Sequence, residues 1–155
     1  MQQTSAFPVA AALSALVLGA IGLGGGIYET LLVDRVWPDN PAVIQPSRGG
    51  IDRKWFWGPI QPLYELALLV TAWMVWSATH ARSWIIVALL AHFAARAWSF
   101  AYFIPRALRF EKLGDLTEEQ ARLARRWTGL SRYRVVLETT AIVSQCAVIF
   151  QFGVP

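Results

Sequence analysis

The chain has 155 residues, which is enough for one domain, and we treat residues 1–155 as a single transmembrane domain. Hydrophobic residues make up 55% of it and charged residues only 15%, which excludes an ordinary water-soluble domain and is typical of a membrane protein. The net charge of +4 comes mostly from two basic connections, where contact with lipid headgroups explains it without nucleic-acid binding.

Four apolar segments are long enough to cross the hydrocarbon core of a bilayer, for which a helix needs about 20 residues. The first lacks a basic leader and stays apolar too long for a usual signal peptide, so we count it as a helix of the protein. Its Gly22 and Gly26 are spaced to admit either a close neighbouring helix or a ligand. The sequence therefore predicts an all-α fold, an integral membrane four-helix bundle. Its spans cover about residues 7–33, 58–78, 84–104 and 132–151.

Two long connections differ in their expected structure. Residues 34–57 are rich in Pro, Asn, Asp and Gly, which predicts irregular chain. Residues 105–134 contain Thr117-Glu118-Glu119-Gln120, a capping box, and then an amphipathic stretch to Trp127. We expect a short cytoplasmic amphipathic helix there, between the third and fourth spans.

Basic residues predict the orientation in the membrane. Both long connections are rich in Arg and Lys, whereas the short turn at 79–83 carries only Arg82. The positive-inside rule places such basic connections in the cytoplasm. We therefore expect a multi-pass protein of the cell (inner) membrane with both termini external.

Away from its ends, each apolar segment contains a charged residue that hydrocarbon should exclude, namely Glu29, Glu65, Arg96 or Glu138. A charge near the bilayer centre costs about 2.5–3.5 kcal/mol on insertion scales, so such residues usually face one another or a cavity. At 1.5 Å of rise per residue, all four lie about 6 to 13 Å from the cytoplasmic helix ends. We take them as candidate catalytic residues around a cytoplasm-facing pocket, with Arg96 as the hub of three carboxyls, at least one of them protonated.

A structural interpretation of the same residues stays open. Glu65 and Arg96 would then be an ion pair that staples two helices together, at a depth where such a pair is costly. Glu29 and Glu138 lie close enough to the interface to reach headgroup water.

Aromatic and polar side chains at the same depth are the candidate substrate-binding residues. Polar groups in a largely aromatic wall suit a planar, lipophilic small molecule. Core packing and interfacial anchoring explain the aromatic residues equally well, and a histidine here is more often an interhelical hydrogen-bonding residue than a catalyst. The candidates are Tyr28, Gln61, Tyr64, His92, Trp98 and Tyr102.

No metal or cofactor is expected. The sequence has no Gly-x-Gly-x-x-Gly, P-loop or His-Glu-x-x-His motif, and its two histidines are too sparse for a transition-metal site. The only cysteine is Cys146, so one chain cannot form a disulfide. Haem ligation by His92 at a subunit interface stays open, since a unit this small often forms homo-oligomers.

Three short stretches near the amino terminus carry a family resemblance. They are Gly24-Gly25-Gly26-Ile27-Tyr28-Glu29, Trp37-Pro38-x-x-Pro41, and Phe56-Trp57 before the second span. In these stretches the chain resembles the small four-helix membrane proteins grouped with the fungal anthrone oxygenases, over roughly the first two helices and their connection. The resemblance implies cofactor-independent oxidation of an aromatic polyketide anthrone to a quinone, and it carries no catalytic residue over to this chain.

The candidate residues suit an enzyme that acts on a lipophilic, aromatic or polycyclic molecule. With Glu65 as base and Arg96 as stabilising cation, proton abstraction would give an enolate that reacts directly with oxygen. A protonated Glu29 or Glu138 acting as general acid would instead suit an isomerase or cyclase.

Two non-enzymatic alternatives are a proton-linked small transporter and an accessory membrane subunit. Transport is disfavoured because all four charges lie in one half of the membrane, whereas alternating access favours a midplane site. A polar path continuing past Gln145 would indicate transport, and a pocket closed to the outside would indicate an enzyme.

Overall fold

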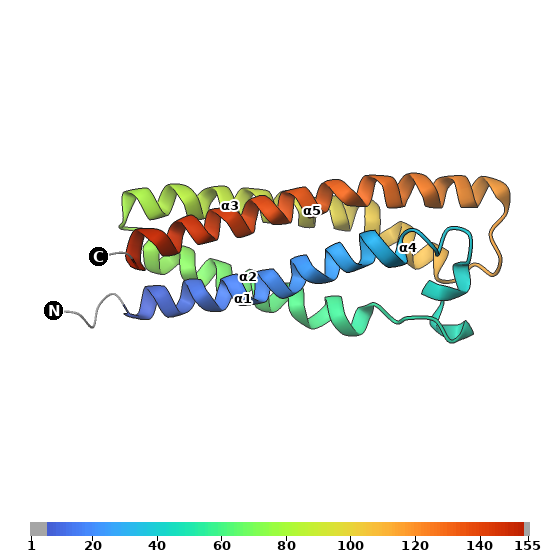
Figure 1. The fold of residues 1–155 in the computed structure, drawn as a ribbon, viewed down its shortest axis with the longest axis horizontal. Helices are drawn as coiled ribbons and strands as arrows, with labels where there is room; N and C mark the ends of the chain where they lie inside the picture. The colour runs from blue at the N-terminus through green and yellow to red at the C-terminus, as the bar shows by residue number, and fades with distance from the viewer. Residues whose placement is uncertain (1–5, 154–155) are drawn as a thin grey trace.

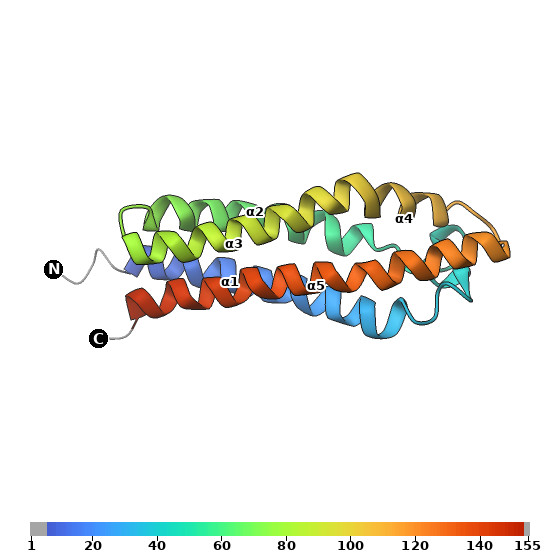
Figure 2. The same ribbon diagram turned by 90° about the horizontal axis from the view of Figure 1, so that it is seen from above.

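The computed structural model describes residues 6–153, and within them the regular elements are all helical (Figure 1). Four long helices lie side by side along the molecule, with a short helix at one end (Figures 1 and 2). They are α1 (Ala6–Tyr28), α2 (Lys54–Val75), α3 (Thr79–Trp98) and α5 (Glu118–Gly153), and the short one is α4 (Ile104–Phe110). We call the end that holds the start of α1 and the end of α5 the terminal end, and the opposite end the connection end.

Within residues 6–153, three helical stretches are long and apolar enough to cross a membrane. They are Phe7–Val33, Thr79–Phe110 and Glu118–Gln151, so the first, third and fourth apolar segments have the length and composition predicted for membrane spans. The second segment also forms a helix, α2, but this helix is not among the three. It carries Pro59, Pro62 and Glu65.

Two π-helical turns extend the long helices at the connection end. The turn η1 (Glu29–Val33) continues α1, and the turn η4 (Ser99–Phe103) joins α3 to α4. A π-helical turn contains one more residue than an α-helical turn, and such turns occur frequently at functional sites. Hydropathy gave no indication of either turn.

The predicted separate amphipathic helix is instead the beginning of α5. The capping box forms as expected, since the Thr117 and Gln120 side chains each accept a backbone N–H of the other residue, at 3.3 and 2.9 Å. No proline or turn cluster follows Trp127, and Gly129 alone costs a helix only about 1 kcal/mol. Ala124 and Trp127 are buried in the protein and do not face lipid headgroups.

Two apolar clusters lie at the two ends of the molecule. The terminal-end cluster packs aliphatic and small side chains of α1, α2, α3 and α5, among them Leu68, Val75, Ile85, Ala88 and Val148. The connection-end cluster is mostly aromatic and joins both connections to α5, through Trp37, Ile44, Phe103, Phe110 and Trp127.

The first connection is irregular, as expected, but it is firmly attached. It contains two short 3₁₀ turns, η2 (Pro41–Ile44) and η3 (Pro46–Arg48). Between them the buried Gln45 amide donates to the carbonyl oxygens at the end of α4 and just beyond, at 3.1 Å from Phe110 and 3.0 Å from Gly114, and also to that of Leu113. One amide therefore holds the two long connections together.

Candidate functional site

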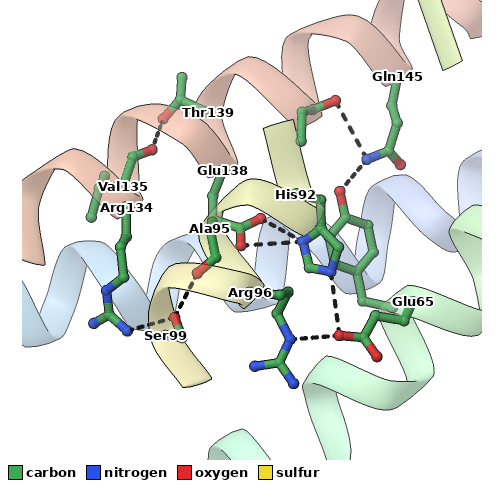
Figure 3. A network of polar contacts seen from close by, with 12 residues as sticks. Glu65, His92, Ala95, Arg96, Ser99, Arg134, Val135, Glu138, Thr139 and Gln145 are labelled. Carbon is green, nitrogen blue, oxygen red and sulfur yellow. Dashed lines mark hydrogen bonds and ion pairs between the residues drawn. The ribbon is translucent and has the colours of Figure 1, made fainter. Parts of the chain in front are cut away.

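His92 on α3 is the centre of a polar network that joins three helices (Figure 3). Its Nδ1 lies 3.0 and 3.2 Å from the two carboxylate oxygens of Glu138 on α5. Its Nε2 lies 3.6 Å from Oε1 of Glu65 on α2. The same Glu65 oxygen accepts a hydrogen bond from Nε of Arg96, at 2.5 Å.

The expected hub, Arg96, is not the residue that brings the carboxyls together. Arg96 pairs with Glu65 alone, Glu138 is held by His92, and Glu29 accepts a 2.9 Å hydrogen bond from the indole N–H of Trp57. His92 lies one helical turn from Arg96 on the same face of α3, where it meets α2 and α5 together.

Protein groups surround the imidazole of His92, and each of its two nitrogens faces a carboxylate. The imidazole is fully buried and packs edge-on against Tyr64, with ring centroids 4.6 Å apart. Glu138 and Glu65 face opposite ring nitrogens, so their oxygens do not converge on one point. Within residues 6–153 no group of three His, Cys, Asp or Glu side chains could hold a metal ion.

A cavity of about 360 Å³ lies beside this network at the connection end. Its wall comes from α1, η1, α2, α3, η4, α4 and α5 and from residues next to them. Three of the four candidate catalytic residues line it, namely Glu29, Arg96 and Glu138. Glu65 does not line the cavity and is bound to Arg96.

The glycines of α1 and the π-helical turns help to open this cavity. Gly22 and Gly26 both line it, and a Cβ at Gly22 would meet no atom within 4 Å. These two glycines therefore border the empty space. The close approaches of α1 are at Gly19, where a Cβ would clash with Ile142 and Tyr64, and at Gly25, where it would clash with Phe56. Each π-helical turn begins with a residue of the wall, Glu29 in η1 and Ser99 in η4.

The six candidate substrate-binding residues fall in different places. Gln61 lines the cavity, and its Oε1 is buried without a hydrogen-bond partner. Tyr64 lies behind the cavity against His92, and its hydroxyl accepts a hydrogen bond from the Gln145 amide. Tyr28 is 55% exposed and does not line the cavity. Trp98 and Tyr102 also lie outside the wall, where both pack against Phe103.

Arg134 is the most important cavity residue that the sequence reasoning missed. Its Nη1 donates to the hydroxyl of Ser99 at 3.2 Å and its Nη2 to that of Ser131 at 2.9 Å, while its guanidinium lies 4.1 Å from the ring centroid of Phe103. All four residues line the cavity. A usable signal was present, because residues 131, 134 and 138 recur at helical spacing and form one polar stripe on α5.

A charged cluster borders the cavity where the two connections meet. Glu111, just after α4, forms two ion pairs. Its Oε1 lies 3.1 Å from Nη2 of Arg53, and its Oε2 lies 3.2 Å from Nζ of Lys54. Arg53 and Glu111 are almost completely buried. The cluster joins the start of α2 to the end of α4 across the cavity wall.

Among the charged groups of the wall, one carboxylate and two guanidinium groups lie at the level of the His92 network. Glu138 is oriented from behind by His92, and Arg96 and Arg134 line the same cavity. Such a site can accept a proton from carbon and stabilise the negative charge that develops on a conjugated oxygen.

Comparisons with models of protein families, with curated proteins and with solved structures find no match to this chain. Function is therefore inferred from the cavity and the residues around it.

Proposed function

We propose that this chain is an integral membrane enzyme that acts on a lipophilic, aromatic or polycyclic small molecule by acid/base chemistry in the connection-end cavity. One observation carries the proposal: Glu138, held from behind by His92, lines a mostly apolar cavity that Arg96 and Arg134 also line. A lipophilic ligand dissolves in the bilayer and would enter the cavity from there. The lipids of the bilayer are then also binding partners of the protein.

The membrane arrangement that we propose is a four-helix bundle in which α2 also spans the bilayer. Exposed tryptophans stand near both ends of α2, at Trp55 and at Trp73, about 27 Å apart along the helix. That separation matches a hydrocarbon core of roughly 30 Å with aromatic residues at both interfaces. The basic connections would then be cytoplasmic, and both termini external, in the cell (inner) membrane.

Oxidation of an anthrone illustrates the chemistry that the site would perform. Glu138 takes a proton from the CH₂ carbon, and Arg96 stabilises the resulting enolate oxygen. The carbanion gives its electrons to O₂ and, with one proton, becomes a hydroperoxide. Loss of water from that carbon gives the second carbonyl, so anthrone and O₂ yield the quinone and H₂O.

Glu138 is a better candidate for the base than Glu65, which the sequence favoured. Glu138 lines the cavity, whereas Glu65 does not and is occupied by Arg96 at 2.5 Å. Glu65 would instead position Arg96 and His92 from outside the cavity.

The packing of the terminal end supports an enzyme over a transporter. Near Gln145, the buried hydroxyls of Thr71 and Ser144 are satisfied within their own helices, since each donates to a carbonyl one turn earlier at 2.8 Å. Aliphatic side chains such as Leu68, Val75 and Val148 fill the remaining interior. Among the described residues, no polar path continues from Gln145 toward the terminal end.

The test is oxidation of anthrone by purified protein in nanodiscs, followed through oxygen uptake and quinone absorbance. We expect a rate above that of empty nanodiscs, and a loss of about 10²- to 10⁴-fold in Glu138→Gln, because that variant lacks the base. Glu119→Gln, an exposed site on the same helix, is the matched control.

Two other outcomes have definite meanings. Exchange of the CH₂ protons in D₂O without oxygen uptake would replace the oxygenase with the isomerase or cyclase alternative. Full activity in Glu138→Gln would refute the role of this site.

A further inference from the structure

Four cationic side chains line the cavity, and Arg134 differs from the other three. Arg53 and Lys54 pair with Glu111, and Arg96 pairs with Glu65. For Arg134, no carboxylate oxygen of residues 6–153 lies within the 4.0 Å limit of an ion pair. Arg134 is therefore the cation of the wall without a contact ion pair, and the nearest acidic residues of the same wall, Glu29 and Glu138, act on it only from a longer distance.

Arg134 is also held in place with hydrogen-bonding capacity to spare. A guanidinium has five N–H donors in a fixed planar fork, and the contacts to Ser99 and Ser131 use two of them. The Nε–H is buried and has no partner in the protein. Both serines are buried, and the ring of Phe103 lies against the guanidinium at 4.1 Å, so the group is fixed before any ligand arrives.

Burying a fixed guanidinium that has no ion-pair partner beside apolar side chains costs free energy unless an anion pairs with it. We propose that Arg134, with Ser99 and Ser131, binds a carboxylate group of the lipophilic ligand, an inference that rests on the proposed function. The forked donors match the two oxygens of a carboxylate. Apolar wall residues such as Leu23, Ile104 and Leu108 then receive the hydrocarbon part.

The spacing on α5 adds a constraint on the ligand. Arg134 and Glu138 are four residues apart and both line the cavity, which puts their Cβ atoms about 6 Å apart. The ligand's carboxylate and its acidic carbon are therefore separated by about one helical turn. The preferred substrate is then a polycyclic or aromatic carboxylic acid, and a neutral ketone such as anthrone is the weaker substrate.

The test compares 9-anthracenecarboxylic acid with 9-anthracenecarboxamide, which has nearly the same shape and no charge. Binding to the protein in phosphatidylcholine nanodiscs is measured by fluorescence titration. We expect the acid to bind at least about tenfold more tightly than the amide, since a hydrogen bond to a charged group contributes about 1.5–3 kcal/mol. Arg134→Met should remove that preference, and Arg132→Met, an exposed neighbour on α5, should keep it.

The shift of the melting temperature on adding the acid is a second measure of binding, which remains usable if a variant is less stable than the wild type. The acid should raise the melting temperature of the wild type and of Arg132→Met but not that of Arg134→Met or Arg134→Lys, because lysine keeps the charge without the fork. Equal affinity for acid and amide in the wild type, or an unchanged preference in Arg134→Met, would overturn the inference.

A lipid headgroup is a second source of an anionic oxygen group. Titration in nanodiscs that contain phosphatidylglycerol separates the two sources. If this lipid displaces the acid from the wild type and co-purifies with it but not with Arg134→Met, the bound anion is a headgroup and the carboxylate ligand is refuted.

Glu138→Gln separates this inference from the proposed function. Acid binding that persists in that variant, with no oxidation by the wild type, would leave the anion site intact and refute the enzyme. Oxidation by the wild type, together with equal affinity for the acid and the amide, would support the enzyme and refute the carboxylate site.

Discussion

The two ends of the helices in this protein use opposite packing principles. At the terminal end, small and aliphatic side chains such as Leu68, Ile85 and Ala88 are fully buried against one another. At the connection end, π-helical turns, glycines and charged side chains surround a cavity of about 360 Å³. Close packing at one end fixes the helices, which allows the other end to hold buried charge around empty space.

The largest expected effect is in the polar network between the two ends. His92→Leu would leave Glu138 and Glu65 without the imidazole that both face, and leaving a buried carboxylate without its partner costs about 3–4 kcal/mol. We expect a lower free energy of unfolding in detergent together with a loss of activity.

His80→Leu is the matched control, since His80 is exposed on the same helix. The double variant His92→Leu/Glu138→Gln should regain part of the lost stability, because the uncompensated carboxylate is gone. Equal stability of His92→Leu and His80→Leu would show that the network does not stabilise the fold.

A substitution that creates a cavity at the terminal end should lower the stability of the protein and leave its activity unchanged. Leu68→Ala removes a fully buried side chain that does not line the cavity, which costs about 2–3 kcal/mol of unfolding free energy. Activity per folded molecule should stay at the wild-type value, as measured by oxygen uptake below the unfolding temperature. The exposed Leu66→Ala, on the same helix, serves as the control. If Leu68→Ala instead changed turnover without changing stability, the separation of the two ends would be wrong.

The smallest effect concerns Asp34 at the connection end. Burial raises the pKa of this carboxyl from 3.8 to about 6, although the indole N–H of Trp37 donates to it at 3.0 Å and opposes the rise. The folded state therefore holds a proton that the unfolded state has lost between about pH 4 and 6, and stability falls as pH rises through this window.

Asp34→Asn should remove this pH dependence. A shift of about two pKa units corresponds to about 3 kcal/mol, and the buried Asn NH₂ group offsets part of it, which leaves about 1 kcal/mol of stabilisation above pH 6. Melting temperatures from pH 4 to 8 check this, with the exposed Asp39→Asn as the control. A parallel pH profile in wild type and Asp34→Asn would contradict the expected titration.

Much of the fold could be predicted from the sequence because it follows from local patterns. Apolar length gave the helices, and the pattern at residues 117–120 gave the cap that begins α5. The two π-helical turns and the three carbonyls bound by Gln45 could not be predicted, since they depend on contacts between segments far apart in the chain. The length of α5 was missed because a stop was expected where only Gly129 stands.

The sequence predicted the level of the charged residues along the helices, but not the direction in which their side chains point. A rise of 1.5 Å per residue gives the level of each charged residue, and the predicted Glu65–Arg96 contact is present. The rotation of each helix about its axis is decided by packing, so the sequence did not show that Glu65 lies outside the cavity wall while Arg134 lies in it. The central position of His92 was underestimated for the same reason.

The turn η4 makes the length of this segment as informative as its composition. Because a π-helical turn holds one extra residue, deleting one residue from Ser99–Phe103 would restore ordinary α-helical winding and leave α4 close to its present orientation relative to α3. Ordinary winding with all five residues kept would instead rotate α4 by about 100°, one residue's step in an α-helix. Ala107 and Glu111 would then leave the wall, although every cavity side chain was still encoded. In an alignment with a relative, a one-residue gap at this turn would therefore indicate ordinary winding with the same cavity wall.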